Sequence, residues 1–172
     1  PWWSERREAL LGLMQGRDAA YVYDAATIRA RCSALRGLKS VARVLYAMKA
    51  NPNAEVLRLV HAAGLGFECV SRGEAEHALR AVPGLSASDI LFTPNFAPRA
   101  EYEWALAAGL RVTVDNAYAL REWPEVFRGH EIFVRVDPGV GRGHHQHVRT
   151  GGAFSKFGVP IDEMVEAIAL AD

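Results

Sequence analysis

Lys49 is the residue whose type and position point most directly to chemistry. It follows the apolar run 43–48 and precedes Asn51-Pro52, a pair typical of a helix start. At the end of a buried strand, beside Arg135 and a helix N-terminus, its amine would be partly desolvated and less readily protonated. An uncharged amine is the nucleophile that imine formation needs. The alternative is that Lys49 extends into solvent without a chemical role.

Polar residues also follow the later apolar runs. Glu68 could pair with Lys49 or with a cofactor, and Arg135 could bind an anion or pair with Asp137. In a parallel β/α barrel the C-terminal ends of the strands carry the functional site, so we expect these side chains to meet. The residues at these ends are Lys49, Glu68, Thr93 with Asn95, Asp115, and Arg135 with Asp137.

The segment 137–157 is too long and too rich in Gly, His and Arg for a plain connection, and long loops in compact domains are usually functional. Its histidines could suggest a metal site, but no cysteine or carboxylate completes a recognisable ligand spacing. We therefore expect no metal and favour an anion-binding loop. The residues concerned are His144, His145, His147, Arg142 and Arg149.

The elements that must position these residues are short apolar runs alternating with helical patterns. Strands are expected at 21–23, 43–48, 66–70, 89–93, 111–114 and 131–136. Helices are expected at 24–35, 53–63, 73–82, 98–108, 117–123 and 161–170. Asp24 is the expected N-cap of the first helix, and Asn51 that of the second.

Strand starts from residue 43 onward recur at a step of roughly 22 residues, which predicts parallel strands with right-handed crossovers. A doubly wound sheet and a (β/α)8 TIM barrel both fit such an α/β pattern. The regular step, and the absence of a Gly-rich fingerprint after the first strand, favour the barrel. Because a full barrel needs about 250 residues, the chain would form a partial one.

Composition excludes several classes of protein. The 172 residues carry a formal net charge of zero and are half apolar, so nothing favours nucleic acid or a membrane as partner. No signal peptide is recognisable, and Cys32 and Cys69 suggest neither a disulfide framework nor a metal site. A cytoplasmic protein is expected. The start without Met and the end inside a helical pattern favour a piece of a longer chain over a complete small domain.

Three motifs and one arginine resemble those of the alanine-racemase-like (fold-type III) pyridoxal-phosphate-dependent decarboxylases. The run 46–53, YAMKANPN, resembles the cofactor-lysine motif, and the run 67–74, FECVSRGE, resembles the second-strand motif. Glu68 stands there where many members have Asp. The run 114–116 resembles the fourth-strand motif, and Arg135 falls where the family carries a cofactor-side arginine. The resemblance, from about Ala20 onward, implies pyridoxal 5'-phosphate bound by Lys49, Glu68 and Arg135.

The loop and the segment after it resemble diaminopimelate decarboxylases more than ornithine decarboxylases. A His, then Thr-Gly, then Lys-Phe-Gly carries this likeness, which implies substrate or loop roles for His145, His147, Thr150 and Lys156. The doubled histidines at 144–145 resemble the versions that are fused to an aspartate kinase.

The resemblance implies a helical lead-in over 1–19 and a truncated alanine-racemase-like barrel over 20–172, without the family's C-terminal β-domain. The implied activity of the full-length protein, a homodimer, is decarboxylation of meso-diaminopimelate to L-lysine and carbon dioxide. The fragment alone would be inactive. Three alternatives stay open: another amino-acid decarboxylase (ornithine, arginine), a non-catalytic pyridoxal-phosphate carrier, or a cofactor-free barrel with a Schiff-base lysine.

Overall fold

A five-stranded parallel sheet forms the centre of the computed structural model, which describes residues 1–140 and 156–171. The strands lie in sequence order, each beside its neighbour in the chain. This order is that of a (β/α)8 barrel, because a doubly wound sheet reverses its order at a switch point. The expected barrel order is thus confirmed. The strands are β1 (Leu45–Ala47), β2 (Gly66–Cys69), β3 (Ile90–Phe92), β4 (Arg111–Val114) and β5 (Ile132–Val134).

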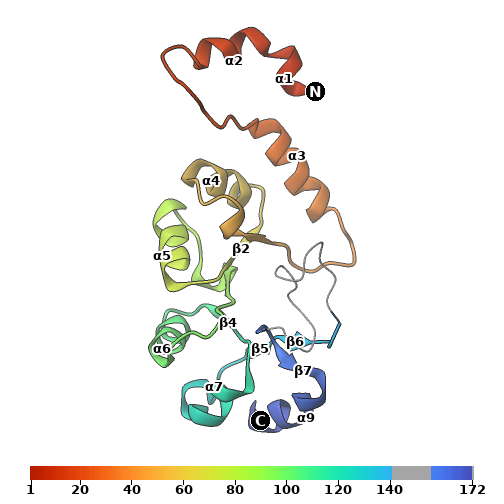
Figure 1. Cartoon of the computed structure of the whole chain (residues 1–172), viewed down its shortest axis with the longest axis vertical. Helices are drawn as coiled ribbons and strands as arrows, with labels where there is room; N and C mark the ends of the chain where they lie inside the picture. Colours follow the sequence, from red (N-terminus) through yellow and green to blue (C-terminus); the bar gives the residue numbers. More distant parts are fainter. Residues whose placement is uncertain (141–155, 172) are drawn as a thin grey trace.

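Helices connect successive strands and follow one another along the outer side of the sheet (Figure 1). A helix precedes the first strand, α3 (Ala25–Arg36). The connecting helices are α4 (Ala54–Ala62), α5 (Arg72–Ala81), α6 (Arg99–Ala107), α7 (Ala117–Glu122) and α8 (Pro124–Phe127). A last helix, α9 (Met164–Ala171), packs against α7 and α8. The sequence pattern indicated all of these except α8.

Aromatic side chains fill the layer between sheet and helices. Phe67 of β2 stacks on His61 of α4, and Phe92 of β3 makes edge contacts with Tyr102 and Trp104 of α6. Both phenylalanines are fully buried. Because side chains alternate along a strand, Glu68 faces away from this layer. The outer face of the sheet therefore packs against the helices and forms the core, whereas its inner face carries polar groups.

The helix caps agree with the sequence at α3 and differ at α4. Asp24 accepts a hydrogen bond of 2.8 Å from the main-chain N–H of Thr27, as expected. The N-cap of α4 is Asn53, whose side chain accepts from Glu55 N, and not Asn51. A short 3-10 helix, η1 (Met48–Ala50), follows β1 directly and shifts the helix start. Asn51 instead accepts a hydrogen bond from the N–H of Asn53.

Two predicted strands differ from the structure. Residues 21–23 form no strand, because no other strand lies beside them to supply hydrogen bonds, and Tyr21 is 92% exposed. The run 131–136 divides, so that β5 ends at Val134 and β6 (Val136–Asp137) pairs in parallel with β7 (Val159–Pro160). The pattern did not indicate β7, since a two-residue strand has no alternation to recognise.

The first residues form two short helices, α1 (Trp2–Glu5) and α2 (Arg7–Leu13), neither of which buries a residue. The boundary expected after residue 19 stays a prediction. Within the ranges 1–140 and 156–171, no helix combines the length and the apolar character needed to span a bilayer.

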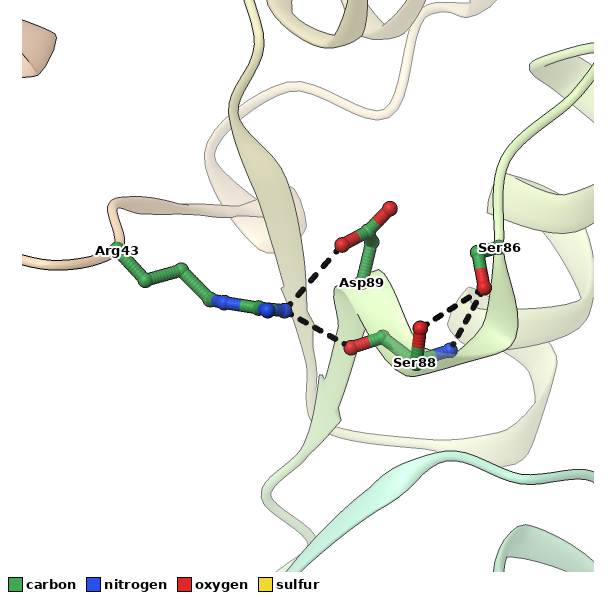
Figure 2. Close-up of polar contacts among 4 residues, drawn as sticks. All are labelled: Arg43, Ser86, Ser88 and Asp89. Carbon is green, nitrogen blue, oxygen red and sulfur yellow. Dashed lines mark hydrogen bonds and ion pairs between the residues drawn. The ribbon is translucent and has the colours of Figure 1, made fainter.

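Arg43 connects the chain before β1 to the chain before β3, at the N-terminal ends of the strands. Its guanidinium donates to Ser88 O at 3.0 Å and to Asp89 Oδ1 at 3.2 Å, as Figure 2 shows. Ser86 holds the turn in place by accepting from the N–H of Ser88. Gly66 allows this close approach of chains, since a Cβ there would lie 2.3 Å from Asp89 O. An ion pair and the close approach at Gly66 therefore join the chain before β1 to the chain before β3.

Candidate functional site

A cavity of about 610 Å³ lies at the C-terminal ends of the strands. Its volume falls in the range of small-molecule sites, which is about 300–1,000 Å³. The wall brings together Lys49, Glu68, Arg135 and Lys156, which the sequence had placed in one site. The other lining residues are Val70, Thr93, Pro94, Asn95, Thr113, Asp115 and Phe157.

A second cavity, about 560 Å³ between α2 and α4, is lined mainly by apolar side chains and is the weaker candidate.

Lys49 occupies the short helix η1, immediately after β1. Its neighbour Met48 is 1% exposed and anchors the turn in the core, whereas the Lys49 side chain is exposed and lines the cavity. The expected burial of this amine is not found. Lys49 lies in η1, after the end of β1, and its side chain is exposed to solvent. The amine is accessible to a ligand that enters the cavity.

Glu68 bonds to Thr93 rather than to Lys49. The Thr93 hydroxyl donates to Glu68 Oε1, and Thr93 N donates to Cys69 O at 2.8 Å. Within the described parts of the chain, no ion pair joins Glu68 to Lys49. Of the two possibilities for Glu68, the pairing with Lys49 is not seen in the structure, and the carboxylate is instead held at the end of β3.

Asp115, directly after β4, is 1% exposed and accepts hydrogen bonds from the side chains of two asparagines. Asn95 Nδ2 donates to Asp115 Oδ2 at 2.5 Å, and Asn116 Nδ2 donates to Asp115 Oδ1 at 3.0 Å. Asn116 also caps α7, since its side chain accepts from Ala119 N. The buried charge is thus stabilised by charge-assisted hydrogen bonds.

Arg135 lies across the ring of Phe157. Its guanidinium carbon is 4.5 Å from the ring centroid, and Lys156 Nζ lies 5.2 Å from the same centroid. The cation–π contact of Arg135 with Phe157 holds the segment after residue 155 against the end of β5. Lys156 O also faces Asn95 Nδ2 at 3.5 Å. Two residues at strand ends, Asn95 and Arg135, therefore place Lys156 at the cavity.

Gly158 lets this segment turn back into β7. Its φ is +83°, and a Cβ on it would lie 2.8 Å from Asp137 N and 3.2 Å from Arg135 O. Only glycine fits such a close approach in the left-handed region. The close packing of main chain around Gly158 therefore explains why the Lys-Phe-Gly motif ends in glycine.

His144, His145, His147, Thr150, Arg142 and Arg149 all lie outside the described residues. In the two ranges that are described, no group of three His, Cys, Asp or Glu side chains is arranged to hold a metal ion. Cys69 is fully buried, as its alternation with Glu68 predicted.

The sequence alone did not assign roles to Thr93, Asn95 or Phe157. Thr93 and Asn95 were noted as polar residues at a strand end, but their partners Glu68 and Asp115 lie on other strands. The parallel register, which places Glu68 opposite Leu91, would have brought Thr93 near Glu68. Phe157 was recognisable only as part of the Lys-Phe-Gly motif, and nothing in the sequence indicated its contact with Arg135.

Known proteins similar to this chain agree on one family. Residues 25–172 match the family model described as the pyridoxal-binding domain of the pyridoxal-dependent decarboxylases. A diaminopimelate decarboxylase of Methanothermobacter thermautotrophicus is 41% identical over 80% of this chain and 32% of its own length. One of Streptomyces coelicolor is 34% identical over 88% of this chain and 34% of its own length.

The structural comparison gives the same result. The crystal structure of diaminopimelate decarboxylase from Helicobacter pylori complexed with L-lysine superimposes with a TM-score of 0.80 at 27% identity. The match covers 93% of this chain and 42% of that one. The chain spans about a third of the length of the curated relatives it matches. It belongs to the pyridoxal-dependent decarboxylases, whose pyridoxal-binding domain accounts for residues 25–172.

Proposed function

We propose that the full-length protein is a pyridoxal-phosphate-dependent diaminopimelate decarboxylase, which converts meso-diaminopimelate to L-lysine and carbon dioxide. One observation carries the proposal: Lys49, within the motif YAMKANPN, lines a cavity together with Glu68 and Arg135. The relatives at 34% and 41% identity are diaminopimelate decarboxylases, which supports this substrate.

The groups that line the cavity fit pyridoxal phosphate. Lys49 presents an exposed primary amine, which would hold the cofactor covalently, and Glu68 and Arg135 provide a fixed carboxylate and a guanidinium. When bound, the cofactor supplies an electron sink for the pair of electrons left by the departing carboxylate. The cavity is large enough for cofactor and an amino acid together.

The remaining polar groups bind and orient the substrate in this proposal. Diaminopimelate carries two carboxylates and two ammonium groups, so a site for it needs charges of both signs. Lys156 adds a cation to the wall beside Arg135, and Glu68 supplies a carboxylate. His145, His147 and Thr150 would complete the substrate side of the site.

We further propose a cytoplasmic homodimer, on the strength of the family resemblance. The doubled histidines at 144–145 support a multifunctional protein in which the decarboxylase is fused to an aspartate kinase. Size-exclusion chromatography with light scattering, and an aspartate kinase assay on the full-length protein, test these two points separately.

Lys49→Ala in the full-length protein tests the main proposal. We expect wild-type protein, after borohydride reduction, to carry a pyridoxyl-phosphate adduct on Lys49 by mass spectrometry, and to release carbon dioxide from meso-diaminopimelate. Lys49→Ala should lose both. The matched control is Lys39→Ala, which removes an exposed lysine outside the cavity and should lose neither. Decarboxylation by Lys49→Ala at the wild-type rate contradicts the proposal.

A panel of substrates separates the alternatives. Carbon dioxide release mainly from ornithine or arginine would identify another decarboxylase of the family. An adduct on Lys49 without release from any amino acid would identify a pyridoxal-phosphate carrier. If borohydride reduction traps no pyridoxyl adduct, the result would favour a cofactor-free barrel with a Schiff-base lysine. The 172-residue chain by itself should release little carbon dioxide, since it covers about a third of the length of its relatives.

A further inference from the structure

A hydrogen bond between the ends of β2 and β3 holds one oxygen of the Glu68 carboxylate. Thr93 Oγ1 donates to Glu68 Oε1, and Thr93 N donates to Cys69 O at 2.8 Å beside it. In the parallel register Glu68 lies opposite Leu91, and Thr93 lies two residues further toward the cavity. The Glu68 side chain is therefore drawn along the strand direction toward the ligand.

The second oxygen of Glu68 remains for a ligand. Among the residues that the structure describes, Glu68 makes this one side-chain hydrogen bond and no ion pair. A carboxylate has about four acceptor positions, so Oε2 and the outer lone pairs are available in the cavity. Lys49 and Arg135 lie in the same wall.

Threonine is well suited to anchor a glutamate. Its β-branched side chain is stiff at χ1, so the hydroxyl stays in one place without a bound ligand. Glutamate has one more rotatable bond than the aspartate that the second-strand motif often contains, and each free rotor adds an entropic cost to binding. The bond to Thr93 removes that freedom before the ligand arrives.

We propose that Thr93 is a positioning residue, which holds the Glu68 carboxylate in place for pyridoxal phosphate beside Lys49. The inference rests on the proposed function, and it adds a residue to which the family resemblance assigned no role. Thr93 acts through Glu68 and does not itself bind the cofactor.

Titration of the full-length apoprotein with pyridoxal phosphate, followed by protein fluorescence, measures this without any assay of activity. Thr93→Val keeps the shape and removes the donor, and it should weaken cofactor binding about tenfold, as expected for a lost hydrogen bond to a charged group. Thr93→Ser restores a donor and should bind within about threefold of wild type. Thr27→Val is the matched control and should bind as wild type, since it also removes a threonine hydroxyl that donates to a carboxylate, that of Asp24, but lies outside the cavity.

A double mutant separates positioning from a structural role. In a Glu68→Ala background, Thr93→Val should change the dissociation constant by less than about twofold, because its partner is already gone. Equal tenfold losses in both backgrounds would show that Thr93 acts independently of Glu68 and would overturn the inference. If Thr93→Val does not fold, Thr93→Ser and Thr93→Ala in both Glu68 backgrounds give the same comparison.

The outcomes also distinguish this inference from the proposed function. Tight binding by wild type, weak binding by Glu68→Ala and wild-type affinity in Thr93→Val would overturn the role of Thr93 alone. No uptake of pyridoxal phosphate by the wild-type apoprotein would overturn the proposed function, and this inference with it.

Discussion

Asn95 and Asp115 form a hydrogen bond of 2.5 Å between the end of β3 and the end of β4, where the carboxylate is almost fully buried. The same amide group faces Lys156 O at 3.5 Å. One asparagine thus connects a buried charge to the segment that carries Lys156 and Phe157. Its removal should affect both the stability of the fold and the placement of Lys156.

Asn95→Ala should lower the free energy of unfolding by about 1–3 kcal/mol, because it leaves a buried carboxylate with one partner fewer. Asn95→Asp should be worse, since it replaces the amide donor by a second carboxyl group against Asp115. Urea denaturation of the full-length protein at neutral pH measures both. A wild-type midpoint for Asn95→Ala would show that this hydrogen bond contributes nothing.

Gly66→Ala should destabilise the protein although it adds a single methyl group. The new Cβ would lie 2.3 Å from Asp89 O and 2.7 Å from a methyl group of Leu45, so main chain must move. Overpacking of this kind costs about 1–3 kcal/mol. Gly12→Ala is the control, because nothing lies within 4 Å of its Cβ position in α2. Unfolding midpoints that fall equally for both variants would contradict this account.

Tyr102→Phe should leave the melting temperature unchanged or raise it. Tyr102 is 1% exposed, and its hydroxyl has no hydrogen-bond partner among the described residues. Burial raises the pKa of this phenol, so the hydroxyl stays neutral and its only effect is the cost of desolvation. Tyr46→Phe is the contrast, because the Tyr46 hydroxyl donates to Asn51 O at 3.4 Å. A clear loss of stability in Tyr102→Phe would reveal a partner for this hydroxyl.

Cys69 should resist alkylation in the native protein at mildly alkaline pH. Burial chiefly, with the nearby charges of Glu74 and Glu68, raises the pKa of this thiol from 9.0 to about 12, and only the thiolate reacts. Between pH 9 and 12 the unfolded chain loses this proton while the folded chain keeps it, so stability falls as the pH rises. Cys69→Ala should remove this part of the alkaline loss.

Iodoacetamide labelling read by mass spectrometry checks the prediction for Cys69. Both cysteines should be labelled in denaturant, and Cys69 should remain unlabelled in the folded protein. Rapid native labelling of Cys69 at pH 8 would mean that β2 opens readily in solution. Denaturation curves between pH 8 and 11, for wild type and Cys69→Ala, give the second measurement.

The alternation of strands and helices and the chemical character of the site could be predicted from the sequence. Apolar runs separated by helical patterns require parallel strands, and the capping bond of Asp24 follows from local chain geometry alone. Lys49 and its motif were recognisable because all the residues that carry the signal are adjacent in the chain. These features depend on interactions over a few residues, and a sequence records such interactions directly.

Which polar side chains pair with each other depends on the folded arrangement of the strands. Glu68 bonds to Thr93 and Asn95 to Asp115 across neighbouring strands, at separations of 25 and 20 residues. Registers set by packing of the core decide such pairs, and no local pattern encodes them. The same holds for the short pairing of β6 with β7, and for residues 21–23, which have strand-like composition but no neighbouring strand. Hydrogen bonds between strands require both partners, and only the folded chain brings them together.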